Sequence, residues 1–330
     1  MAANRMNHYE RIAATIAREE VDRPAIALWR HFPVDDQSPG SLAEATISFQ
    51  RDYDFDLVKV TPASSFCVRD WGAQDEWRGA SEGTREYTHR VIQEPEDWED
   101  LTLLDPMRGS LGGQLECLRL IVEEIGQDVP VIQTIFSPLA QAKNLVGADK
   151  LFVHLRRYPH HLKAGLDVIT KSIQQFIEEA MRIGISGVFY AVQHAQYGLL
   201  SEREYDEFGR SFDLAALEPS MELQFNMLHL HGEQVMFDRF LNYPVSIINW
   251  HDRESPPSLA EAREKFSGAL CGGLRRQETM VLGSPDGVRE ETYDAIQQTD
   301  GKGLILGTGC VMPTIVPRGN IIAARKCVEL

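Results

Sequence analysis

The chain has 330 residues, of which 43% are hydrophobic and 25% are charged, a composition typical of a folded globular protein. Its 33 basic and 49 acidic residues give a net charge of -16, which opposes binding to nucleic-acid phosphates and to an anionic membrane surface. No apolar run approaches the roughly 18–20 residues of a membrane span, and the polar start lacks the apolar stretch of a secretory signal. We therefore expect a soluble, cytoplasmic protein.

Short β-branched runs alternate with amphipathic helical patterns along the chain. An opening helix lies within residues 1–20, and helical patterns such as His160–Ile183, Glu202–Phe225 and Ser258–Phe266 separate later strands. The expected strands are AIALW, DFDLVKV, VPVIQTIF, GVFYAV, MLHLH, VSIINW, GALCGGL and GLILGTG. Eight such units predict a single-domain (β/α)8 TIM barrel over residues 1–330. A doubly wound open sheet is the alternative, but no G-x-G-x-x-G motif supports it.

Residues 66–105, rich in Trp, Glu and Arg, interrupt this alternation after the second strand. We expect them to form an insertion over the barrel mouth, built from a hairpin and a short helix. The five cysteines are scattered and include no C-x-x-C pair, so they do not form a disulfide framework.

Polar side chains gather where the expected strands end, which is where TIM barrels place their chemistry. Five of the ten histidines fall there, more than packing alone explains. We interpret His31, His194 and His251 as candidate catalytic residues. The candidate substrate-binding residues are Trp29, Arg30, Lys59, Gln193 and Asp252.

The sharpest pattern is His229-Leu230-His231. Side chains at i and i+2 of a strand point to the same face, so both imidazoles would enter the barrel mouth together. Cys310, which follows Gly-Thr-Gly at the last strand, would complete a three-ligand zinc site. The alternative is that both histidines hydrogen-bond to substrate or to a carboxylate such as Glu233 or Asp252. Imidazole and thiolate also suit iron or cobalt.

Other rim residues admit two interpretations each. Arg30 could hold a substrate carboxylate or phosphate through two hydrogen bonds, or it could form a salt bridge that closes the barrel top. Lys59 could act as a base or Schiff-base amine with a lowered pKa, or form an ion pair inside the barrel. His251 and Asp252 could pair as a base and its orienting carboxylate, although neighbouring strand residues face opposite sides.

Three stretches carry a family resemblance: VDRPAIALWR, DVPVIQTIFSPLAQAKNLVG and ILGTGCVMPTIVPRGNIIAARKCVE. They resemble the uroporphyrinogen decarboxylase superfamily over nearly the whole chain. The resemblance implies a (β/α)8 barrel with its site at the strand carboxyl ends, and it points to a homodimer. The decarboxylase branch uses no metal and holds substrate carboxylates with paired arginines, of which this chain keeps at most Arg30.

The other branch contains zinc-dependent methyltransferases that transfer a methyl group between a corrinoid protein and a thiol. Its His-x-Cys and later Cys fall on His229, His231 and Cys310, so that the middle ligand is changed from Cys to His. The resemblance therefore favours a zinc-dependent methyl or alkyl transferase that uses a small substrate and a corrinoid partner protein. A metal-free decarboxylase or lyase is the alternative, and a non-catalytic corrinoid- or ligand-binding barrel is a third class.

Overall fold

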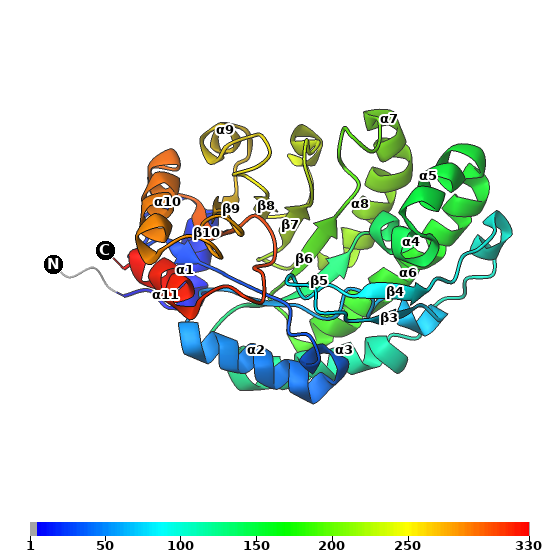
Figure 1. The fold of residues 1–330 in the computed structure, drawn as a ribbon, viewed down its shortest axis with the longest axis horizontal. Coiled ribbons are helices and arrows are strands. Elements are labelled where there is room, and N and C mark those ends of the chain that lie inside the picture. Colours follow the sequence, from blue (N-terminus) through cyan, green and yellow to red (C-terminus); the bar gives the residue numbers. More distant parts are fainter. Residues whose placement is uncertain (1–4, 330) are drawn as a thin grey trace.

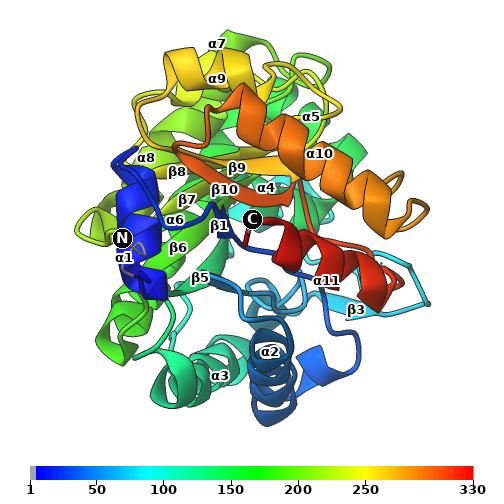
Figure 2. The same cartoon turned by 90° about the vertical axis from the view of Figure 1, so that its left-hand side faces the viewer.

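Eight parallel strands form one curled sheet surrounded by helices in the computed structural model, which describes residues 5–329 (Figures 1 and 2). In the sheet their order is β1-β10-β9-β8-β7-β6-β5-β2. Every residue of these strands is buried. Their bounds are β1 Ala25–Ile26, β2 Val58–Val60, β5 Val131–Phe136, β6 Gly187–Val192, β7 Met227–Leu230, β8 Ile247–Trp250, β9 Ala269–Leu274 and β10 Leu304–Thr308. The predicted TIM-barrel fold is confirmed.

Asp56 joins the two edges of the sheet at the start of the strands. Its N–H donates to the carbonyl of Ile26 at 2.8 Å, and its carboxylate accepts from the Ile26 N–H at 2.9 Å. Arg11 and Arg23 each form an ion pair with this buried carboxylate at 2.7 Å. Because Arg11 belongs to α1 (His8–Ile16), the opening helix is fixed to the end of the barrel that lies opposite the candidate site.

The helices cover the outside of the sheet (Figure 2). After α1, their bounds are α2 Pro39–Tyr53, α3 Gly109–Ile125, α4 Pro138–Val146, α5 Ala148–Arg157, α6 Pro159–Ile183, α7 Glu202–Tyr205, α8 Ser211–Leu217, α9 Leu259–Lys265, α10 Pro285–Gln298 and α11 Arg318–Cys327. The helix predicted over Glu202–Phe225 is interrupted, because a π-helical turn at Asp206–Arg210 separates α7 from α8. None of the helices in the described part of the chain is long and apolar enough to cross a membrane.

The segment predicted as an insertion contains the two-stranded hairpin of β3 (Gln74–Glu76) and β4 (Glu86–His89). Its tip reaches the loop that follows β10. The backbone N–H and the hydroxyl of Thr314 both donate to the carbonyl of Ser81, at 2.6 and 2.9 Å. The first strand is shorter than the predicted AIALW run, because it ends at Ile26. Beyond it, Arg30 forms an isolated parallel bridge with Met312.

Candidate metal centre and cavity

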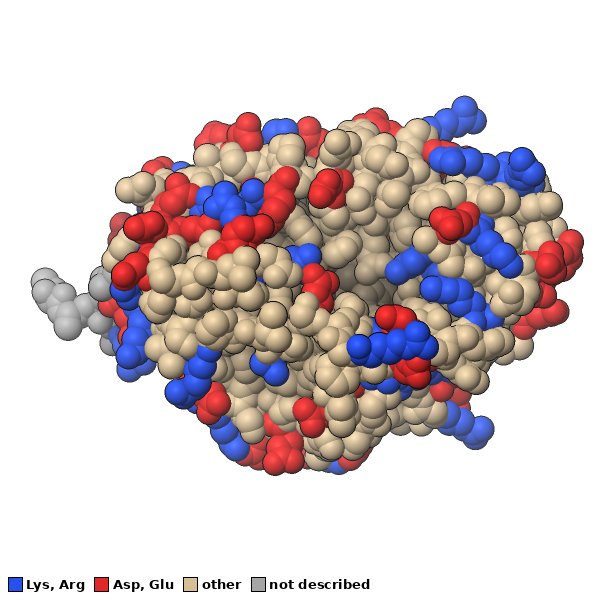
Figure 3. All heavy atoms as spheres, in the orientation of Figure 1, with Lys and Arg blue, Asp and Glu red and all other residues tan. Residues whose placement is uncertain are grey.

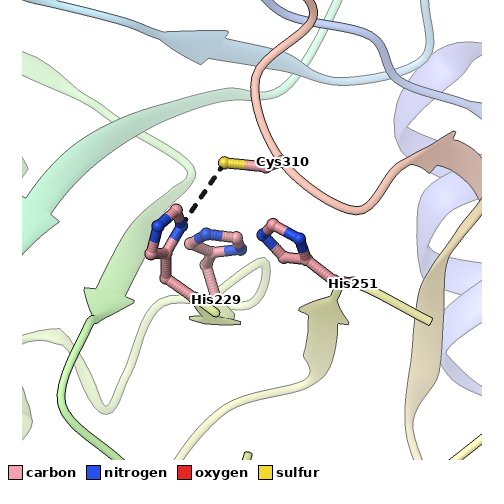
Figure 4. Close-up of side chains that lie close together, drawn as sticks. His229, His251 and Cys310 are labelled. Atoms are coloured by element: carbon pink, nitrogen blue, oxygen red, sulfur yellow. Dashed lines mark hydrogen bonds between the residues drawn. The ribbon is translucent and has the colours of Figure 1, made fainter. Parts of the chain in front are cut away.

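Three histidines and one cysteine meet at the carboxyl ends of the strands. His229 lies on β7 and His231 follows it, His251 follows β8 and Cys310 follows β10. One ligand atom of each lies within 4.8 Å of all the others. Figure 4 shows His229, His251 and Cys310 pointing toward one another. The sulfur of Cys310 lies 3.6 Å from Nδ1 of His231. The structure therefore brings together the three predicted ligands and adds His251, which the sequence had suggested as a catalytic residue.

Local backbone geometry explains how residues so distant in sequence converge. His229 pairs in register with Asn249 on β8, so the residues two positions later, His231 and His251, leave the sheet at the same level. Gly309 then lets the end of β10 approach β8. A Cβ at this position would lie 2.6 Å from the Cα of His251 and 2.8 Å from the carbonyl oxygen of Trp250, so only glycine permits Cys310 to come this close.

The electrostatics of the cluster favour a thiolate. Burial raises the pKa of Cys310, but the electrostatic influence of His229 and the contacts of the sulfur with the three imidazoles outweigh burial and bring this pKa well below its usual value. Burial lowers the pKa of His231, and the hydrogen bond and charge of Cys310 reverse this into a net rise. A thiolate is the form of cysteine that binds metal. Imidazole nitrogens and a thiolate fit zinc, whose catalytic sites take three protein ligands and leave a fourth position for substrate.

A cavity of about 110 Å³ borders this cluster and includes His229, His231 and Cys310 in its wall. Three aromatic side chains, Trp29, Phe136 and Phe189, line it together with the polar residues Lys59, Gln193 and Glu82. Figure 3 shows that this face of the molecule is hollowed near its centre. A dry cavity of roughly 150 Å³ holds one benzene molecule, so the enclosed part of this cavity fits a substrate of a few heavy atoms.

Lys59 is a buried cation in the cavity wall. Its ammonium lies 4.4 Å from the ring centroid of Phe189 and 5.8 Å from that of Trp29, and it donates to the hydroxyl of Thr61 at 3.3 Å. Among the described residues no carboxylate forms an ion pair with it, so the predicted ion pair inside the barrel is not found. Burial lowers the pKa of Lys59 to about 7. The cavity wall therefore holds a buried amine without a carboxylate partner among the described residues, and an anionic group on a ligand would favour its charged form.

Alternation along the strand ends decides which predicted residues reach the cavity. Trp29, His31 and Gln193 line the cavity, and so does His229 on β7. Their neighbours in sequence do not. His31 is buried, and burial is the main cause that lowers its pKa to about 4.

Four predicted catalytic or substrate-binding residues lie outside the cavity wall: Arg30, His194, His251 and Asp252. Of these, His251 belongs to the His/Cys cluster. Arg30 donates to the carbonyl of Thr314 at 3.2 Å. His194 is buried beside Phe152, with ring centroids 6.3 Å apart, and burial lowers its pKa to about 3. Asp252 accepts hydrogen bonds from the backbone N–H of Gly273, the nearer oxygen at 3.1 Å, and burial raises its pKa to about 7. Side chains of adjacent extended residues point to opposite faces, so Arg30, His194 and Asp252 turn away from the cavity and cluster that their sequence neighbours reach.

The hairpin contributes cavity residues that the sequence did not suggest. Glu82 and Thr84 line the cavity, and Glu82 forms an ion pair with Arg276, in the loop after β9, at 2.7 Å. The sequence placed Phe136 and Phe189 on strands but did not predict that they line the cavity. This could have been predicted, because strand alternation points both side chains into the barrel interior. The positions of Glu82 and Thr84 could not have been, because the path of a long insertion cannot be derived from periodicity.

The fold and this site together define a TIM-barrel protein with a candidate His/Cys metal centre at the barrel mouth. The uroporphyrinogen decarboxylase (URO-D) family profile matches residues 7–329, and the chain belongs to that family. The resemblance found in the sequence is thereby confirmed.

Similar proteins include methyltransferases. The chain is 21% identical over 241 residues, 72% of its own length and 69% of the relative's, to the methylcobamide:CoM methyltransferase MtbA of Methanosarcina acetivorans. Its fold matches that of a methyltransferase from Methanosarcina mazei with a TM-score of 0.85 at 17% identity, over 98% of both chains. A B12-independent methionine synthase from Shewanella sp. W3-18-1 matches with a TM-score of 0.57 at 13% identity, over 93% of this chain and 95% of that one. These two likenesses concern the fold.

Proposed function

We propose that this protein is a zinc-dependent methyltransferase that transfers a methyl group from a methylated corrinoid to a small anionic thiol. The observation that carries the proposal is the cluster of His229, His231, His251 and Cys310 at the wall of a small cavity. The MtbA relative, whose name gives a methylcobamide donor, supports the reaction class. Because the cavity is too small to enclose a macrocycle, the corrinoid, either free or carried by a partner protein, would present its methyl group at the cavity mouth.

Zinc bound by three of these residues, His229, His231 and Cys310, would leave a position for the acceptor thiol and would bind it as its thiolate, the nucleophilic form. The cluster differs from a His-x-Cys ligand pattern by having imidazole in place of one thiolate. The resulting site carries one more positive charge, which lowers the pKa of a bound thiol further and leaves its sulfur less electron-rich.

Lys59 would select the acceptor by charge. Its ammonium is buried in the cavity wall and lacks a carboxylate partner among the described residues, so a carboxylate or sulfonate on the thiol would compensate it. Trp29 and Phe189, which flank the ammonium, would exclude water from this contact. A wrong acceptor without an anionic group would leave Lys59 uncompensated, which is the physical basis of the proposed selectivity.

The test is a methyl-transfer assay with a free methylcobamide as donor. The acceptors are 3-mercaptopropionate and, as a neutral thiol of similar size, 2-mercaptoethanol; loss of the methylcobamide absorbance reports transfer. We expect turnover with the anionic thiol, at least tenfold weaker turnover with the neutral one, and loss of both after chelation or in Cys310→Ser. Absence of transfer by the zinc-loaded protein to either thiol would refute the proposal.

A further inference from the structure

The imidazole of His229 is held by two neighbours that belong to the barrel interior. Its Nδ1 lies 2.7 Å from Oδ1 of Asn249, its register partner on β8. Its ring stacks on Phe189, with centroids 5.2 Å apart and an interplanar angle of 23°. His229 and Asn249 are both buried, so water does not compete for this hydrogen bond.

The orientation of the Asn249 amide follows from its other contacts. Its Nδ2 lies 2.9 Å from the carbonyl oxygen of Cys271 and 3.0 Å from that of Thr308. Carbonyl oxygens only accept hydrogen bonds, so the NH₂ group must face them, and a flipped amide would place Oδ1 against two acceptors. Oδ1 is therefore the atom toward His229, and Nδ1 of His229 must carry the hydrogen that it accepts.

The hydrogen on Nδ1 determines what His229 presents to the cluster. In a neutral imidazole one nitrogen carries the hydrogen and the other carries the lone pair, so Nε2 is left as the acceptor. The other two histidines are not fixed in this way. Nδ1 of His231 faces the sulfur of Cys310, and Nε2 of His251 has no hydrogen-bond partner among the described residues.

We infer that Asn249 is a positioning residue that sets His229 in the Nδ1–H tautomer, so that Nε2 is a metal-ready ligand before any ion binds. The tautomer is a property of the chain alone, and only the consequence for zinc binding rests on the proposed function. Outer hydrogen bonds of this kind orient metal-binding imidazoles, and their loss typically weakens metal affinity about 10–100-fold.

The first test observes the tautomer in metal-free protein. Two-bond ¹H–¹⁵N correlation spectra of chelator-treated protein labelled at histidine, assigned by comparison with His229→Gln, distinguish a nitrogen that carries hydrogen from one that does not. We expect hydrogen on Nδ1 of His229 and none on Nε2. Hydrogen on Nε2 would overturn the inference. Because no metal is present, this result does not depend on whether the protein is a methyltransferase.

The second test measures zinc affinity by competition with a chromophoric chelator. Asn249→Leu removes the acceptor at similar size, and we expect its Kd for zinc to rise 10–100-fold. Asn249→Asp keeps an acceptor for Nδ1–H, so its Kd should stay closer to wild type than that of the leucine variant. Asn320→Leu is the control: Asn320 is also buried and donates to two backbone carbonyls within 3.0 Å, but it lies in α11. Equal zinc affinity in wild type and Asn249→Leu would overturn the inference.

Discussion

Lys59→Met is predicted to stabilise the metal-free protein while impairing its function. The buried ammonium has a pKa of about 7, compared with an ordinary value of 10.5, because burial disfavours the charged form. This difference corresponds to a free-energy cost of up to about 5 kcal/mol when the lysine is charged, since each pKa unit is worth about 1.4 kcal/mol. Methionine retains most of the apolar stem without the charge, so the variant escapes this cost.

The sign and pH window of this effect follow from proton linkage. Between pH 7 and pH 10.5 the unfolded chain binds a proton at Lys59 that the folded protein does not, so wild-type stability rises with pH across this range. The advantage of Lys59→Met is therefore largest at and below pH 7 and disappears toward pH 10.5. When an anionic thiol binds to the wild type, its negative charge should offset part of the cost of burying the charged Lys59 ammonium. Lys59→Met has no charge at this position and cannot gain this contribution to binding.

Urea unfolding of chelator-treated wild type and Lys59→Met at pH 6.5 and pH 9.5 measures this directly. We expect the variant to be more stable by several kcal/mol at pH 6.5, and by clearly less at pH 9.5. Lys163→Met, at a partly exposed lysine that pairs with Glu207, is the control and should change stability by less than about 1 kcal/mol. A Lys59→Met variant that is less stable than wild type at pH 6.5 would refute the account of Lys59 as an uncompensated charge.

Two further predictions concern the ends of the barrel. Asp56→Asn should cost about 3–5 kcal/mol of stability, because it leaves buried arginines without their carboxylate. Burial raises the pKa of Asp56, but hydrogen bonds from His8 and Arg23 hold this pKa well below its usual value. The stability of the wild type is therefore lost as the pH falls below about 4. Urea unfolding from pH 7 to pH 3 should show a smaller loss of stability in Asp56→Asn than in wild type. Gly83→Ala should lower the melting temperature and expose the hairpin to limited proteolysis, because Gly83 has φ +78° and a Cβ would lie 2.4 Å from Cβ of His31. Wild-type behaviour in either variant would contradict the packing described here.

Strand periodicity predicted the fold and the parts of the site that lie on strands. The alternation of side chains along a strand predicted that His229 and His231 lie on one face. Applied to the pairs Gln193-His194 and His251-Asp252, the same alternation separates the residue that faces inward from the one that faces outward. The sequence prediction assigned roles to both members of each pair, and this is why His194 and Asp252 proved to lie outside the cavity.

The sequence did not predict the residue at which each strand ends or the path of the insertion. Arg30 appeared at a strand end, but the first strand stops at Ile26, and the guanidinium binds the carbonyl of Thr314 instead. The role of Asn249 depends on carbonyls from two other strands, which only the folded barrel brings within hydrogen-bond distance. Long-range contacts of this kind leave no local pattern in the chain.

The metal content of the protein tests the central claim most directly. Elemental analysis of protein purified without a histidine tag, after reconstitution with zinc and removal of excess, compares wild type with His231→Ala and Cys310→Ser. The account predicts about one equivalent of zinc per wild-type chain and strong loss in both variants, whose cluster would lack one of the ligands that converge within 4.8 Å. A wild-type protein without zinc, or variants that retain a full equivalent, would contradict it.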